Sequence, residues 1–194
     1  MKKINSAIDR FCYQHPRFGI PNLMLWVVIG NVIVYVMDMM SRGTFSAMLS
    51  FVPAYIFQGQ IWRLVTFVLV PNYGSNIFFF AISAYFYYFI GSRLENQWGT
   101  ARFNFFYCSG IVLAIVVGLL EGLIGGGMAV TSTMEYNNLS LFFAFASLFP
   151  DMMVLLFFII PVKVKWLAYL DAAWLLYGVV SLLLKGAYIS ALLP

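Results

Sequence analysis

The chain has 194 residues, of which 63% are hydrophobic and only 9% carry a charged side chain. A soluble domain needs about 25% charged residues to cover its surface, so this composition excludes a water-soluble globular protein. Lipid must supply the missing solvent, and we expect an integral membrane protein. The two cysteines, Cys12 and Cys108, lack the spacing of a metal site, and we expect no metal and no cofactor.

The N-terminal stretch over residues 1–19 is polar and rich in basic side chains. Basic side chains beside an apolar segment are attracted to lipid headgroups, so we expect these residues to form an interfacial arm. Ile20–Met40 then runs 21 residues with a single charge, Asp38, which suits a hydrocarbon layer about 30 Å thick. The membrane domain is therefore expected over residues 20–194.

Residues 41–74 contain no uninterrupted span, because Pro53, Gly59, Arg63 and Pro71 break the apolar pattern. The segment is still strongly apolar, so we expect it to lie in the outer leaflet of the bilayer. Irregular backbone at that depth must be shielded by protein or must satisfy its own hydrogen bonds.

The rest of the chain alternates apolar segments with polar or glycine-rich breaks. We expect further membrane spans at Ser75–Ile90, Phe103–Ile124 and Trp166–Leu184. Asn138–Phe149 is also apolar, but about a dozen residues are too few to cross the bilayer. A sixth apolar segment, Ala187–Pro194, has only eight residues.

Two local patterns add detail to these segments. Gly118 and Gly122 lie one helical turn apart in the third span and form a small-residue face that permits close contact. In Val162–Lys165 the lysines alternate with valine, which predicts an extended segment at the membrane interface with both charges on one side.

Together the segments predict an all-α fold, a polytopic transmembrane bundle of about six helices with a short fourth helix and an incomplete sixth. Cytoplasmic loops of membrane proteins carry an excess of Lys and Arg, so the bases orient the bundle. With the N-terminus inside, eight bases lie on the inner side: Lys2, Lys3, Arg10, Arg17, Arg93, Arg102, Lys163 and Lys165. Three lie outside: Arg42, Arg63 and Lys185. We therefore expect a multi-pass protein whose N-terminal arm is cytoplasmic.

Two motifs lie near the second predicted span. Gly91, Glu95 and Gly99 have a Gly-x-x-x-Glu-x-x-x-Gly spacing, and the segment Gln60-Ile61-Trp62-Arg63-Leu64-Val65-Thr66 contains a Trp-Arg pair. The first motif resembles the end of the second transmembrane helix in the rhomboid family of intramembrane serine proteases, and the second is similar to the Trp-Arg loop of that family. The resemblance implies a six-helix bundle in which Trp62 and Arg63 order the outer loop. It also implies that Glu95 ties the loop and helix ends together at the inner face.

The resemblance further implies a specific catalytic set. Rhomboid proteases place a nucleophilic Ser in a Gly-x-Ser-Gly motif at the start of the fourth helix, and a His base on the sixth. A His and an Asn on the second helix hold the oxyanion. Ser140, in Asn138-Leu139-Ser140-Leu141, matches the nucleophile without either glycine. Tyr188 lies at the base position, and Phe79 and Ser83 lie at the oxyanion positions.

These replacements remove the chemistry that a serine protease needs. The phenol of Tyr188 has a pKa near 10, stays protonated at neutral pH and is a poor base. Phe79 has no hydrogen-bond donor for an oxyanion, and Leu141 puts a bulky side chain where the motif needs bare backbone. The sole histidine, His15, lies on the N-terminal arm, on the opposite side of the bilayer from Ser140.

We therefore interpret the chain as a rhomboid-like pseudoprotease of a bacterial cell membrane that binds transmembrane segments of client proteins without cleaving them. One alternative is an active intramembrane serine protease in which Ser140 uses a non-standard base such as Lys185. Another is a small transporter component that uses Glu121 and Asp171 as intramembrane polar sites. The expected partners are the lipid bilayer and client transmembrane segments, and we expect no nucleic acid.

Overall fold

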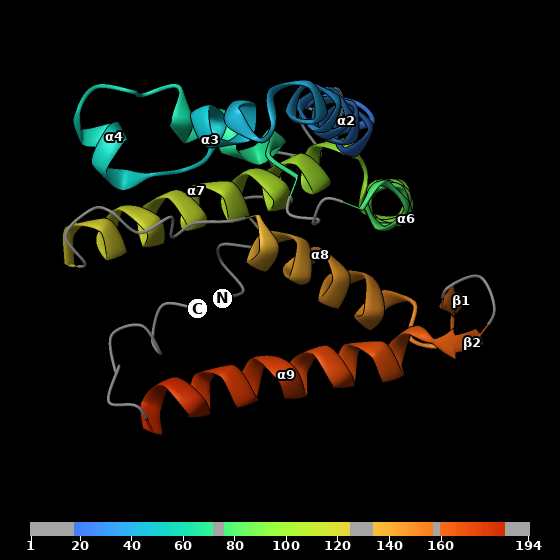
Figure 1. Cartoon of the computed structure of the whole chain (residues 1–194). Helices are drawn as coiled ribbons and strands as arrows, with labels where there is room; N and C mark the ends of the chain where they lie inside the picture. Colours follow the sequence, from blue (N-terminus) through green and yellow to red (C-terminus); the bar gives the residue numbers. More distant parts are fainter. Residues whose placement is uncertain (1–17, 72–75, 125–133, 157–159, 185–194) are drawn as a thin grey trace. The chain divides into compact units, whose positions relative to one another are not determined.

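The structure is a computed structural model that describes residues 18–71, 76–124, 134–156 and 160–184 (Figure 1). The chain divides into two compact units, residues 1–138 and 139–194. Helices dominate both units, which confirms the predicted all-helical membrane fold. Most of the N-terminal arm, with His15 and Cys12, lies outside the described residues, and so does the expected sixth segment Ala187–Pro194.

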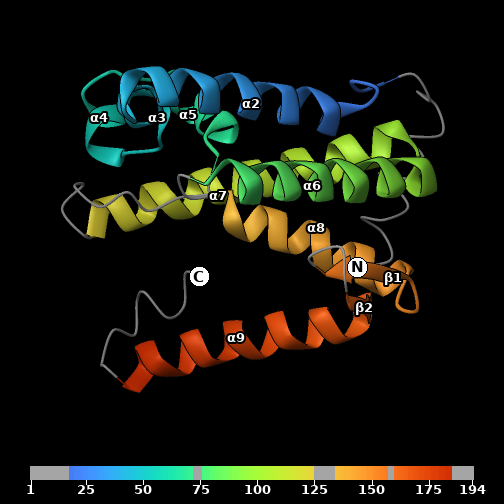
Figure 2. The same cartoon turned by 45° about the vertical axis from the view of Figure 1, so that its right-hand side comes forward.

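Three helices of the first unit are long and apolar enough to cross a membrane: α2 (Leu23–Ser41), α6 (Ile77–Trp98) and α7 (Thr100–Ile124). They lie side by side, with α6 in contact with both of the others (Figures 1 and 2). Between α2 and α6 the rings of Tyr35 and Phe80 stack with their centroids 4.1 Å apart. On the same pair of helices, Met24 packs directly against Gly91, where a Cβ would lie 2.5 Å from its side chain.

The predicted second span was too short, because α6 continues eight residues beyond Ile90 to Trp98. The added segment is polar, but Arg, Leu, Glu and Gln all favour the helix, so polarity alone does not end it. The helix ends at Gly99, whose φ of +85° is readily adopted only by glycine. The next helix, α7, begins at the following residue.

The segment between α2 and α6 contains no span, in agreement with the prediction. It folds into four short elements: α3 (Thr44–Leu49), α4 (Pro53–Phe57), α5 (Arg63–Thr66) and the 3₁₀ helix η1 (Phe67–Leu69). The small-residue face of α7 contacts this segment, since Gly122 lies directly under the ring of Pro53 at the start of α4. A Cβ on Gly122 would be 2.2 Å from the Cβ of Pro53.

The helix α8 (Glu135–Leu148) begins three residues before the predicted Asn138, and its first turn belongs to the first unit. In the second unit, β1 (Met153–Leu156) and β2 (Ile160–Lys163) pair antiparallel, with Met153 opposite Lys163. The last described element is α9 (Val164–Leu184).

The hairpin was not predicted, because apolar runs of four residues cannot be told from helix by their pattern. The expectation of extended backbone over Val162–Lys165 is right as far as Lys163 and wrong beyond it. Val164 and Lys165 instead open α9, and their N–H groups donate to the carbonyls of Met152 and Pro150, at 2.9 and 3.2 Å. These bonds satisfy the first donors of the helix.

Replacing Gly122 by alanine is expected to lower the melting temperature in detergent by several degrees. The proline ring cannot rotate away from the new methyl group, so α4 must move, and such overpacking costs about 1–3 kcal/mol. Gly178 on α9 is the matched control, because a Cβ there meets no described atom within 4 Å. Gly178→Ala should leave the melting temperature unchanged or raise it slightly. Equal losses for the two variants would contradict the close contact at Gly122.

Candidate functional site

Glu95, near the end of α6, joins the starts of α2 and α7. Its Oε1 accepts a hydrogen bond from the backbone N–H of Asn22 and another from the hydroxyl of Thr100, both at 2.9 Å. The side chain is buried, with 8% of its surface exposed. A carboxylate at the N-terminal end of α2 also faces the favourable end of that helix dipole. One oxygen atom thus connects three membrane helices.

Asn104, one turn into α7, strengthens the same junction. Its Oδ1 accepts from the N–H of Ile20 at 3.0 Å, and its Nδ2 donates to the carbonyl of Ile20 at 3.0 Å. The same Nδ2 donates to the carbonyl of Thr100 at 2.8 Å. Sequence reasoning missed this residue, although a buried asparagine in a membrane helix is itself a signal of a specific partner.

Arg63 is buried, with 5% of its surface exposed, and it holds the C-terminal end of α3. Its Nη1 donates to the carbonyls of Ala47 and Ser50, at 2.9 and 2.7 Å, and its Nε donates to Oε1 of Gln60 at 2.7 Å. A cation on terminal helix carbonyls satisfies acceptors that have no partner within the helix. Trp62, in contrast, exposes about half of its surface.

The other end of α3 is held by Asp38, another residue that sequence reasoning did not single out. The carboxylate accepts from the N–H of Ser46 at 2.8 Å and from the hydroxyl of the same residue. The backbone carbonyl of Asp38 accepts from the N–H of Gly43 at 3.1 Å. The short helix α3 is therefore fixed at both ends by charged side chains.

Ser140 was expected at the mouth of the fourth helix, and the structure corrects this placement. Because α8 begins at Glu135, Ser140 is the sixth residue of the helix. Only the first four N–H groups of a helix lack a partner within it, so the N–H of Ser140 is occupied by the helix itself. The side chain is exposed, whereas that of Leu141 is fully buried.

The other expected catalytic positions lie in the first unit or outside the described residues. Phe79 and Ser83 lie one turn apart on α6, in the first unit, while Ser140 belongs to the second. Phe79 exposes 52% of its surface, and Ser83 is half-buried. Tyr188 and Lys185 lie outside the described residues.

The two acidic residues considered for a polar site also belong to different units. Glu121 is half-buried in the last turn of α7, next to the contact between Gly122 and α4. Asp171 is half-buried in the second turn of α9. Among the described residues, no three His, Cys, Asp or Glu side chains are grouped so that they could hold a metal ion.

Asp151 makes an exposed ionic cluster at the base of the hairpin. The Nζ atoms of Lys163 and Lys165 each lie 3.3 Å from its Oδ1. Hydrogen bonds from Lys165 and then Lys163 lower the pKa of the Asp151 carboxyl below its ordinary value. The two lysines that were expected to share one side of the segment thus meet on one carboxylate.

Removing the carboxylate at the helix junction should destabilise the protein. We expect Glu95→Ala to lower the melting temperature in detergent by several degrees, because the Asn22 N–H and Thr100 hydroxyl lose their acceptor at a cost of about 1–3 kcal/mol. Glu95→Gln keeps an acceptor oxygen and should lower the melting temperature by less than Glu95→Ala does. Arg63→Ala should behave like Glu95→Ala, while exposed Arg42→Ala serves as the control. A melting temperature unchanged by both Glu95→Ala and Arg63→Ala would refute these structural roles.

The Asp151 cluster predicts a pH dependence of hairpin stability. A carboxyl whose folded pKa is lowered contributes stability above its unfolded pKa, about 3.9, and loses it as the pH falls through the folded pKa. At pH 7 the amides of β1 and β2 should therefore exchange with deuterium faster in Asp151→Asn than in the parent. The difference should shrink in high salt and vanish in strong acid. A difference that persists in strong acid would show that the ion pairs are not its cause.

Comparison with known proteins places the chain among membrane proteins. A family model described as "Eukaryotic integral membrane protein (DUF1751)" matches residues 22–193. Neither the curated proteins nor the solved structures contain a match. The expectation of a bacterial cell membrane is corrected by this result, because the matching family is described as eukaryotic. The match extends from the start of α2 almost to the last residue, and the chain belongs to this family of integral membrane proteins.

Proposed function

We propose that this integral membrane protein is a rhomboid-like pseudoprotease that binds transmembrane segments of client proteins and does not cleave them. The observation that carries the proposal is the position of Ser140 in the interior of α8. We further propose that the N-terminus is cytoplasmic, because eight of the eleven bases then lie on the inner side.

Hydrolysis by Ser140 would need two groups that this chain does not supply at the expected positions. Its hydroxyl needs a neighbouring base, but the single histidine is at position 15 and a tyrosine is at position 188. An oxyanion needs donors aimed at it, and the N–H of Ser140 is already engaged within the helix. Losing one oxyanion donor costs about 10²–10³ in turnover, and the loss of the base adds to it.

The structural contacts of the resembling motifs are, by contrast, intact. Glu95 accepts two hydrogen bonds at the helix junction, and Arg63 donates to two carbonyls at the end of α3. A chain that keeps such contacts while its catalytic positions change is favoured to work by binding. The fold alone does not identify the bound molecule, so client binding rests on the family resemblance.

The surface that would meet a client is the aromatic face of α6. Phe78, Phe79 and Tyr85 each expose more than half of their surface on this helix. Aromatic side chains supply large contact areas in a bilayer, where helix association depends on close packing instead of the hydrophobic effect. The outer segment of short helices lies on the chain just before this face. An incoming transmembrane helix could pack there without entering a catalytic site.

The protein is expected to show no serine-protease activity. Purified protein in lipid vesicles should leave generic rhomboid substrates intact and should not react with a fluorophosphonate probe. Ser140→Ala should be indistinguishable from the parent in both assays. Cleavage or labelling that is lost in Ser140→Ala would instead establish the serine-protease alternative, and a proton or ion flux that depends on Asp171 would establish the transporter alternative.

Binding can be measured in the same vesicles with dye-labelled single-pass segments. Energy transfer to a dye on the protein should persist when the vesicles are diluted with excess lipid. A photo-crosslinking residue at Tyr85 should capture the segment more efficiently than one at Met40, which is even more exposed but lies on α2. Energy transfer that falls to the value for random mixing, with equal capture at both positions, would refute client binding.

A further inference from the structure

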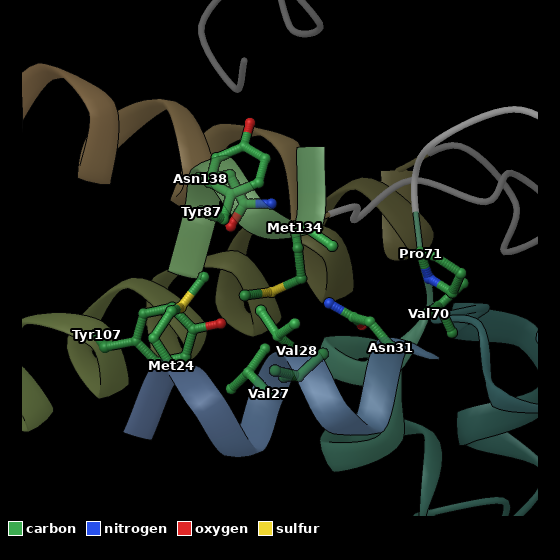
Figure 3. A pocket seen from close by; sticks show the side chains of 12 residues that line it. Met24, Val27, Val28, Asn31, Val70, Pro71, Tyr87, Tyr107, Met134 and Asn138 are labelled. Atoms are coloured by element: carbon green, nitrogen blue, oxygen red, sulfur yellow. The ribbon is translucent and has the colours of Figure 1, made fainter. Parts of the chain in front are cut away.

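A small pocket lies within the first unit, between α2, α6 and α7 (Figure 3). Eight of its twelve lining residues are apolar, and none of the twelve is charged. The lining residues are Met24, Val27, Val28, Asn31, Val68, Val70, Pro71, Ala84, Tyr87, Tyr107, Met134 and Asn138. An apolar pocket in a membrane protein can remain dry, so its polar members decide what it holds.

Two polar atoms in this pocket are buried without a hydrogen-bond partner among the described residues: the Tyr107 hydroxyl and Oδ1 of Asn31. Only 2% of Tyr107 is exposed. Figure 3 shows the Tyr107 hydroxyl, on α7, and the Asn31 amide, on α2, both directed into the pocket, with the amide nitrogen of Asn31 on the side toward Tyr107. Buried polar groups in native proteins are almost always paired, so two unpaired groups that line one pocket indicate a missing partner.

Asn31 lies at a depth in the membrane where an unpaired polar group needs a hydrogen-bond partner from within the protein. It is the ninth of the nineteen residues of α2, and so lies near the middle of that span. Bulk water does not reach this depth, and lipid tails offer no hydrogen bonds. A third group lies close by, since Asn137 Nδ2 has no hydrogen-bond partner among the described residues and its side chain packs on Gly110, one turn beyond Tyr107 on α7.

The size and chemistry of the pocket restrict its occupant. The cavity has a volume of about 10 Å³, and one bound water molecule needs about 10–15 Å³. A cation is disfavoured because no carboxylate lines the pocket, and an amino-acid side chain is too large. A water molecule can donate to Asn31 Oδ1 and also bond the Tyr107 hydroxyl, which accepts and donates.

We propose that this pocket is a binding site for one ordered water molecule that bridges Asn31 on α2 and Tyr107 on α7. The water completes the hydrogen bonding of both groups, and it connects two membrane helices in the middle of the bilayer. The amide of Asn138, on the pocket wall at the start of α8, supplies a third polar group within the same unit.

Radiolytic footprinting of the parent protein in lipid tests the site directly, because a bound water generates hydroxyl radicals beside the residues that hold it. Tyr107 should be oxidised in spite of its burial, and the yield should fall severalfold in Asn31→Leu. Phe103, fully buried and stacked on Tyr107 with ring centroids 6.3 Å apart, is the dry control and should remain unmodified. Equal protection of Tyr107 and Phe103 in the parent would overturn the proposal.

Thermal melts provide a second test whose sign depends on the water. If the water is bound, Tyr107→Phe removes one of its partners and should lower the melting temperature by about 2–4 °C. In a protein that already carries Asn31→Leu, the water bridge is broken. There Tyr107→Phe should leave the melting temperature unchanged or raise it. Tyr87→Phe is the control, since its hydroxyl points away from Asn31 and Tyr107 in Figure 3. A rise or no change on Tyr107→Phe in the parent would show that the pocket is dry.

Discussion

The first unit depends on a single buried carboxylate oxygen, Oε1 of Glu95, which accepts from the backbone before α2 and from the first side chain of α7. Apolar helices in lipid gain little from the hydrophobic effect when they meet, so their association needs close packing and specific polar contacts. Glu95 supplies such a contact at one end of three helices. One turn earlier, Gly91 lets Met24 approach the α6 backbone, so the polar junction and the close packing act together.

The predicted membrane spans agree with the structure because long apolar segments carry their own signal. Ile20–Met40 and Phe103–Ile124 lie within three residues of α2 and α7 at both ends. The C-terminal end of α6 and the start of α8 were harder to predict. A helix that leaves the hydrocarbon, as α6 does, can continue through polar residues such as Arg93 and Glu95. The hairpin before α9 was missed because its strands have four residues each and no distinctive alternation.

The candidate site was only partly predictable, because the sequence reveals motif residues but not the partners of residues outside a motif. Motif spacing singled out Glu95 and Arg63, and the structure gives both a set of hydrogen-bond partners. Asn104 and Asp38 belong to no motif. Asn104 bonds the backbone of Ile20, 84 residues away, and Asp38 bonds Ser46 across a turn whose conformation the sequence does not reveal. Ser140 was placed by a motif that lacked both glycines, and the helix start at Glu135 moves it inside α8. A motif without its turn-forming residues therefore does not fix the local backbone.

The single residue between α6 and α7 has a consequence for how the protein is made. Only Gly99 separates Trp98, the last residue of α6, from Thr100, the first residue of α7. No loop is therefore long enough to keep one helix in water while the other is in lipid. We therefore expect the two helices to enter the lipid together, as a helical hairpin. Arg93 and Arg102 lie on either side of this turn. A paired insertion of α6 and α7 is thus the expected consequence of a turn that consists of one residue.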